Sequence, residues 1–188
     1  MTEEVKKRET VEIPSNFIGD FKVGDNLVYN ADLLCALHDA NTKGVFNKVI
    51  VVQVGSILEA ALGQIIYRAQ HFNREGVPNI DEADRKEIEG KQVDKLNNII
   101  DVMRKYGLLK DLGAGIYDEL HRLRKYRNKV HIQDDNKDVP RDEPVAFSDE
   151  HCVWSVELNI RVLKHLSEKF PRPAANAKYV NALNVPKP

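Results

Sequence analysis

The long apolar stretch from Val45 to Tyr67 constrains the fold of this chain more than any other segment. It opens with a run rich in valine and isoleucine and continues past Glu59 into a second apolar half. A stretch of this length could cross a membrane, or it could form a helix surrounded by other helices. Glu59 would lie near the centre of a bilayer, and Gln53 and Gln64 would add to the cost of insertion. We therefore predict a central core helix from about Phe46 to Phe72.

The rest of the chain also has the pattern of helices. Apolar residues recur at helical spacing over most of its length, and only residues 10–13 alternate as a strand would. Asp81 and Ser148 are suited to cap helices, and Pro171 would stop the last one. The sequence predicts an all-α bundle of about five helices. Their expected spans are 25–41, 46–72, 82–106 (one helix, or two interrupted near Gly90), 112–132 and 149–170.

Length and composition favour one soluble domain. The 188 residues suit a single core at about 24–171, with peripheral arms at 1–20 and 172–188. With 28 basic and 29 acidic side chains, the chain lacks the broad positive field of proteins that bind nucleic acid over a large surface. Its cysteines, Cys35 and Cys152, have no metal-ligand spacing, and the charged N-terminal segment does not resemble a secretory signal. We expect a cytoplasmic protein without a metal or cofactor.

Polar residues interrupt the apolar face of the helix expected at 112–132. At about 100° per residue, Arg127 lies in the middle of the apolar sector, and Arg124 and His131 lie just beside it. A charge aimed at the buried side needs a partner, an interface or a cleft, because an unpaired buried charge is very costly. The other basic residues of this segment are expected on the opposite, solvated side: Arg122, Lys125 and Lys129.

Two interpretations of these polar residues are open. In the structural one, Arg127 pairs with Glu59 of the central helix or with Glu119, and the pair fixes helix packing while His131 caps the arrangement. In the functional one, the same residues form a reactive site. Tyr126 and Trp154 are interpreted as core or interface aromatics under either view.

Residues 124–131, Arg-Lys-Tyr-Arg-Asn-Lys-Val-His, resemble the signature of the HEPN superfamily, helical domains of higher eukaryotes and prokaryotes with nucleotide-related activities. That signature is an arginine, often followed by a polar residue, with a histidine four to six residues later. Six residues separate Arg124 from His131. Arg127-Asn128 resembles the arginine and polar pair, but only three residues separate Arg127 from His131, one fewer than the usual spacing. Either arginine is thus a candidate. Residues 54–62 resemble the glutamate-bearing apolar helix of many members.

The resemblance implies a helical bundle that dimerises, so that two facing motifs cleave RNA without a metal ion. Arg124, Arg127, Asn128 and His131 would be catalytic, with Glu59 in a supporting role. A histidine can act as acid or base near neutral pH, and an arginine can bind two phosphate oxygens. Asn128 would orient the histidine or hold the ribose. The expected product carries a 2′,3′-cyclic phosphate.

Family analogy also suggests a setting and its alternatives. Some members are toxins whose partner modifies a tyrosine two residues after the histidine; Gln133 stands there in this chain, which argues against that subclass but not against another antitoxin. We expect a metal-independent endoribonuclease in a toxin or antiviral defence system, acting on RNA as a homodimer. The alternatives are a non-catalytic module that binds RNA, nucleotides or a protein, and a purely structural adaptor.

Overall fold

A computed structural model describes residues 9–71, 75–91, 93–131 and 137–188 of the chain. The described residues are mainly helical, which confirms the all-α prediction. Predictions that concern residues 1–8, Phe72, Ile132 and Gln133 lie outside this described part.

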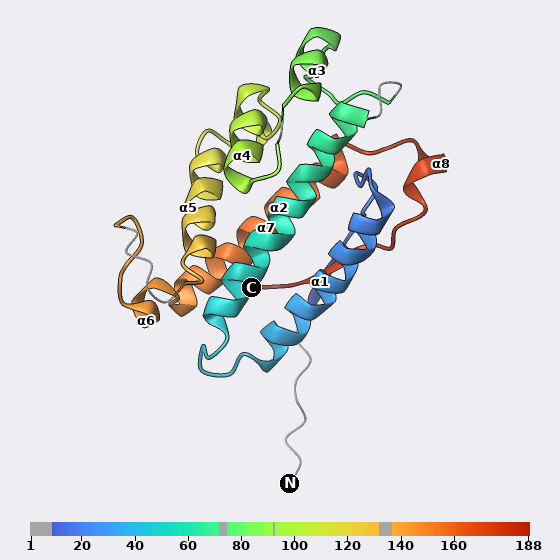
Figure 1. The fold of residues 1–188 in the computed structure, drawn as a ribbon. Coiled ribbons are helices and arrows are strands. Elements are labelled where there is room, and N and C mark those ends of the chain that lie inside the picture. Colours follow the sequence, from blue (N-terminus) through green and yellow to red (C-terminus); the bar gives the residue numbers. More distant parts are fainter. Residues whose placement is uncertain (1–8, 72–74, 92, 132–136) are drawn as a thin grey trace.

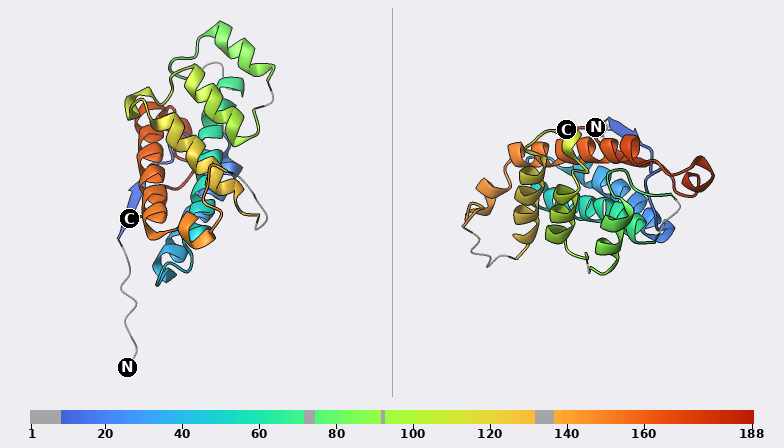
Figure 2. Two further views of the ribbon diagram at one scale, coloured as in Figure 1. Left: turned by 90° about the vertical axis from the view of Figure 1, so that its left-hand side faces the viewer. Right: turned by 90° about the horizontal axis from the view of Figure 1, so that it is seen from above.

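Helices of very different length follow one another along the chain. The elements are β1 (Thr10–Ile13), α1 (Phe21–Ala40), α2 (Asn47–His71), α3 (Glu82–Glu89), α4 (Leu96–Lys105), η1 (Lys110–Leu112, a 3-10 helix), α5 (Ile116–Asn128), α6 (Glu143–Ala146), α7 (Asp149–Lys169), α8 (Ala174–Ala177) and β2 (Leu183–Pro186). Figure 1 shows α2 crossing the middle of the molecule, with α1 on one side and α4 and α5 on the other. The view from above in Figure 2 shows α7 behind this layer.

The central position of α2 follows from its apolar sequence. It contacts α1, α3, α4, α5 and α7, and residues such as Ile50, Leu58 and Ile65 are completely buried. Within the described part of the chain, α2 is the one helix long and apolar enough to cross a membrane, and 61% of its most apolar window is buried inside the protein. The prediction of a central core helix is confirmed.

Polar caps and glycine set most helix ends where the sequence predicts them. The Asp81 carboxylate accepts a hydrogen bond from the Asp84 N–H, and the Ser148 hydroxyl accepts one from the His151 N–H. The segment expected at 82–106 is two helices, α3 and α4, separated after Gly90. α1 begins four residues earlier than predicted, because the Asp20 carboxylate caps it.

The two arms form part of the folded body. β1 and β2 pair as antiparallel strands, with Val11 opposite Val185 and Ile13 opposite Leu183. Ile13, Leu183 and Val185 are buried, since β2 packs against α1 and β1 against α7. The expectation of peripheral arms is therefore wrong for residues 9–20 and 172–188, because alternate apolar side chains of both strands complete the core.

A buried ion pair fastens the segment after α7 to the end of α2. Arg172 binds Glu75 through two bonds of 2.8 Å, and the two side chains are only 4% and 12% exposed. Its remaining terminal nitrogen donates to the carbonyls of Ile18 and Gly19. The Arg172 guanidinium lowers the pKa of the Glu75 carboxyl, and burial lowers the pKa of nearby Arg68 to about 10.

One face of α7 remains open. Its apolar residues pack on α2, but Val153 is 42% exposed, and Trp154 and Ile160 are half-buried. The helical period alone does not show how far neighbouring helices cover each flank of α7.

Candidate functional site

The helix that carries the motif, α5, starts later than its apolar pattern predicts. Leu112 belongs to the preceding turn η1, and Gly113 follows it with a φ of 98°. That backbone conformation favours glycine and does not continue a right-handed helix. α5 therefore begins at Ile116, which is buried together with Leu120.

α5 also ends earlier than predicted. The Lys129 N–H donates to the carbonyls of Lys125 and Tyr126 at 3.2 and 3.1 Å, and these bonds tighten the last turn. The helix ends at Asn128, so the prediction that it continues through His131 is wrong.

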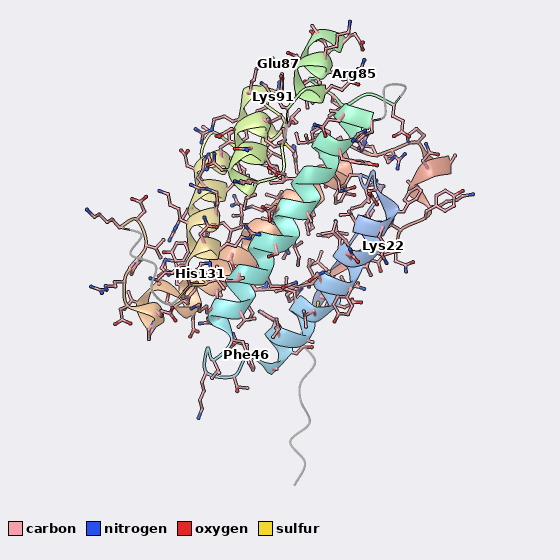
Figure 3. The ribbon with its side chains drawn as sticks, viewed as in Figure 1. Lys22, Phe46, Arg85, Glu87, Lys91 and His131 are labelled. Atoms are coloured by element: carbon pink, nitrogen blue, oxygen red, sulfur yellow. The ribbon has the colours of Figure 1, made fainter. Side chains whose placement is uncertain are left out.

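Because of this turn, Lys129 and His131 lie in surroundings opposite to those predicted: the first is buried and the second exposed. Lys129, assigned to the solvated face, is only 1% exposed, and that prediction is wrong. His131, assigned to the edge of the apolar sector, is exposed. Figure 3 shows it at the lower end of α5. Both differences arise because the 100° step between residues ceases to apply where the helix stops.

Arg127 makes the ion pair with Glu59 that the structural interpretation anticipates. Its Nη2 lies 2.5 Å from Glu59 Oε2, and the side chains are 30% and 22% exposed. The other carboxylate oxygen, Oε1, accepts a hydrogen bond of 2.9 Å from the Leu96 N–H, the first of α4. One glutamate thus joins α2, α4 and α5, and it serves as the missing cap of α4. Glu119, the other suggested partner, binds Arg161 and Trp154 instead.

A glycine in α2 gives Arg127 room to reach this glutamate. A Cβ atom placed on Gly55 would lie 3.0 to 3.1 Å from the Cβ, Cγ and Cδ atoms of Arg127. These contacts are tighter than side chains normally make, so the arginine stem runs over α2 only because Gly55 has no side chain.

Arg124, Asn128 and His131 are the predicted site residues that remain available for a ligand. Asn128 and His131 are exposed, and no hydrogen bond from a described residue reaches the His131 ring. Arg124 is half-buried, and its Nε atom is enclosed without a hydrogen-bond partner among the described residues. Because Nε is enclosed, only the terminal nitrogens of the Arg124 guanidinium could donate to an anion at this end of α5.

A second histidine stands near Arg124. The Nε2 atom of His121 lies 3.6 Å from Asp101 Oδ1. Burial lowers the pKa of His121, and the positive charge of Arg124 lowers it further, while Asp101 acts in the opposite direction. This histidine therefore favours its neutral form near neutral pH.

An aromatic cluster covers the other side of α5, and the sequence did not reveal its connections. The Tyr126 hydroxyl lies 3.1 Å from His151 Nε2, and the Ser148 hydroxyl lies 3.1 Å from His151 Nδ1. Tyr126 is a core residue, 4% exposed, as predicted. Arg122 lies over the Trp154 ring at 4.4 Å from its centroid. The one local signal of these contacts is the spacing of Ser148 and His151: a residue three positions after an N-cap serine can contact its hydroxyl.

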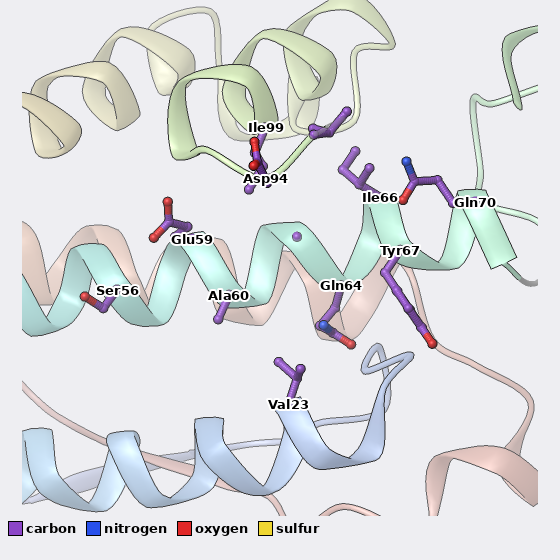
Figure 4. Close-up of a pocket in the computed structure, with 12 residues that line it drawn as sticks. Val23, Ser56, Glu59, Ala60, Gln64, Ile66, Tyr67, Gln70, Asp94 and Ile99 are labelled. Carbon is purple, nitrogen blue, oxygen red and sulfur yellow. The ribbon is translucent and has the colours of Figure 1, made fainter. Parts of the chain in front are cut away.

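A groove of about 410 Å³ lies along α2 beside the Arg127–Glu59 pair. Small side chains, Ser56 and Ala60, form part of its floor, and Val23 of α1 and Ile99 of α4 form its walls. Figure 4 shows Glu59 pointing from α2 toward the segment that carries Asp94 and Ile99. The groove thus borders the joint between α2, α4 and α5 rather than the exposed end of α5.

Within the described part of the chain, no group of three or more histidine, cysteine, aspartate or glutamate side chains is arranged to hold a metal ion. The chemistry available at the end of α5 is that of arginine, asparagine and histidine. Comparison of the chain with family models, with curated proteins and with solved structures gives no match.

Proposed function

We propose that this protein is a metal-independent endoribonuclease that works as a homodimer, with Arg124, Asn128 and His131 as its reacting groups. The observation that carries the proposal is the end of α5, where an exposed histidine and asparagine follow an arginine whose donors bind no described residue. The resemblance of residues 124–131 to the HEPN signature supports the same assignment.

The contacts of the two arginines suggest different roles for them. Arg127 is engaged by Glu59, a bond that also fixes the start of α4, so we assign it a positioning role. Arg124 is the arginine that we assign to the phosphate, because it has no described carboxylate partner and six residues separate it from His131. A guanidinium can donate two parallel hydrogen bonds to phosphate oxygens.

The proposed reaction is an attack within the RNA itself. His131 of one copy takes the proton of a ribose 2′-hydroxyl, and the 2′-oxygen attacks the adjacent phosphorus. The bond from phosphorus to the 5′-oxygen breaks, and His131 of a second copy gives that oxygen a proton. Arg124 stabilises the added negative charge on the phosphorane. The products are a 2′,3′-cyclic phosphate and a free 5′-hydroxyl.

The setting forms part of the same proposal. A nearly neutral chain, with 28 basic and 29 acidic residues, attracts RNA weakly at a distance. Substrate choice then depends on the shape of the dimer or on a protein partner. A cytoplasmic toxin or antiviral effector restrained by such a partner fits this requirement.

The test incubates the purified protein with cellular RNA in the presence of EDTA and assays the fragments for 2′,3′-cyclic phosphate ends. We expect the parent to cut and His131→Ala and Arg124→Ala to lose at least about 100-fold in rate. His71→Ala is the matched control, because His71 is an exposed histidine at the far end of α2. Cutting by His131→Ala at the parent rate would refute the proposal.

A second candidate function is a non-catalytic module that binds RNA. Two observations favour it: Arg127 is committed to Glu59, and no described group orients the His131 ring. In that case the parent and His131→Ala would bind RNA equally and neither would cut it. The same incubation, followed by a filter-binding assay, separates the two functions.

A further inference from the structure

The guanidinium of Arg122, on α5, lies over the indole of Trp154, on α7. The guanidinium carbon of Arg122 lies 4.4 Å from the centroid of the Trp154 ring and 5.7 Å from that of Tyr126. Arg122 is exposed and Trp154 is half-buried, so one side of the guanidinium rests on the indole. We call this pair of side chains the Arg122–Trp154 shelf.

The indole is held in place before any ligand arrives. Its Nε1–H donates to Glu119 Oε2 at 3.2 Å, and the same oxygen accepts a hydrogen bond from Arg161. The Tyr126 ring packs beside it, with centroids 6.1 Å apart. A platform that is already ordered loses little conformational entropy when it binds.

The charge of Arg122 is not neutralised by the carboxylates around it. Asp118 binds Arg104, Glu119 binds Arg161, and Asp138 binds Lys125. No ion pair or hydrogen bond joins Arg122 to any residue of the described ranges. Arg104 differs in this respect, because it too lies over an aromatic ring, that of Tyr117, but pairs with a carboxylate.

We propose that the Arg122–Trp154 shelf binds an unpaired base of single-stranded RNA. The base would stack on the open side of the guanidinium, and the N–H groups at its edge would donate to the adjoining phosphate. The exposed face of the guanidinium suits a nucleobase, which can stack on it, better than an acidic side chain, because a carboxylate binds only the N–H groups at the edge of a guanidinium. Arg122 lies about 9 Å before Asn128 along the axis of α5 and on the side of the helix opposite Arg124, so a strand bound at the shelf would have to cross α5 to reach the end of the helix.

This inference rests on the proposed function for its ligand, RNA, and the two can be tested separately. Trp154 is the single tryptophan of the chain, so intrinsic fluorescence reports on the shelf directly. The experiment titrates the full-length His131→Ala protein, which should not cut, with an oligouridylate or oligoadenylate strand. A duplex of the same length and inorganic phosphate are the comparison ligands.

We expect saturable quenching by the single strands and little change with duplex or phosphate. Arg122→Ala should weaken binding of the single strand about tenfold or more. Arg122→Lys should weaken it nearly as much, because lysine keeps the charge but offers no plane. Arg104→Lys is the matched control and should bind as the parent does, since that arginine already has a carboxylate partner.

Three results would refute base binding at the shelf: no quenching by single strands, quenching by phosphate alone, or undiminished binding of single strands by Arg122→Lys. Circular dichroism of each variant checks that it is folded. If the parent cuts RNA while Arg122→Lys binds and cuts normally, the nuclease stands and the shelf fails. If single strands quench Trp154 in an Arg122-dependent way but the parent does not cut, the shelf stands and the nuclease fails.

Discussion

Two arginine–glutamate pairs, one beyond the end of α2 and one at its middle, differ in how completely their hydrogen-bonding capacity is used. Arg172 and Glu75, just beyond α2, make two bonds at 4% and 12% exposure, and the third nitrogen of Arg172 binds backbone carbonyls. Arg127 and Glu59, at the middle of α2, make one bond at 30% and 22% exposure. The first pair has nothing left for a ligand. The second positions α5 while solvent still reaches both side chains.

The comparison shows that one arginine of the 124–131 segment is committed to helix packing while Asn128 and His131, close to it in the sequence, stay exposed. Glu59 binds Arg127 and the first N–H of α4. By fixing α5 against α2, this joint determines where Arg124 and His131 lie.

The largest expected effect comes from removing the saturated pair. Arg172→Ala should lower the free energy of unfolding by about 3 kcal/mol, because it leaves Glu75 charged and buried without its partner. RNA cleavage per folded molecule should stay unchanged. Urea denaturation measures the first quantity and a cleavage assay the second. Lys187→Ala, which removes an exposed ion pair with Glu9, is the control and should leave stability unchanged.

The same pair should make stability sensitive to acid. The folded-state pKa of Glu75 lies below its ordinary value of 4.5, so its ion pair stabilises the fold fully above that pH. That contribution is lost as the pH falls through the lowered folded-state pKa. The difference in stability between parent and Arg172→Ala should therefore shrink as the pH drops below 4.5. A constant difference down to pH 2 would contradict the assigned role.

Breaking the more exposed pair, Arg127 and Glu59, should lower the free energy of unfolding by less, and by a similar amount from either side. Glu59→Ala and Arg127→Ala should each cost about 1 to 2 kcal/mol of unfolding free energy, with Glu59→Ala the costlier because the Leu96 N–H also loses its acceptor. The double variant should cost clearly less than the sum. Arg124→Ala should leave stability unchanged and lower the rate of the proposed RNA cleavage at least about 100-fold. Additive costs would show that Glu59 and Arg127 are not coupled.

The smallest effect concerns the glycine beneath Arg127. Alanine is normally favoured over glycine inside a helix by about 1 kcal/mol. Gly63→Ala should show that gain, because its nearest neighbour, Ile99, lies at an ordinary 3.7 Å. Gly55→Ala should lose it, because the new methyl group displaces Arg127. Thermal unfolding of the two variants measures the difference, and equal melting temperatures would contradict this account.

Local sequence signals predicted the helices well and the site only in part. The caps Asp81 and Ser148, the apolar run of α2 and the alternation at residues 10–13 depend on neighbours a few residues away, and all are found. No glycine or proline marks the end of α5, so the predicted helix was too long at its C-terminal end. The predicted surroundings of Lys129 and His131 were wrong for that reason.

Contacts between distant residues could not be predicted from local pattern. Arg172 and Glu75 are both common surface residue types, and nothing near either one indicates that they meet in the interior. The stacking of Arg122 on Trp154 depends on the packing of α5 against α7. The bond between Arg127 and Glu59 was one of two suggested alternatives, and only the three-dimensional arrangement distinguishes them.

The short ladder between β1 and β2 bears on the order in which the chain folds. Its paired residues lie near opposite ends of the sequence, so forming it first would close a loop that contains every helix of the described part of the chain. The entropy of closing such a loop must be lost before four residue pairs can compensate for it. Once α1, α2 and α7 have packed, the two strands are already neighbours and the closure costs little. We therefore expect the helices to pack first through local contacts and the two strands to pair late, on a bundle that is already formed.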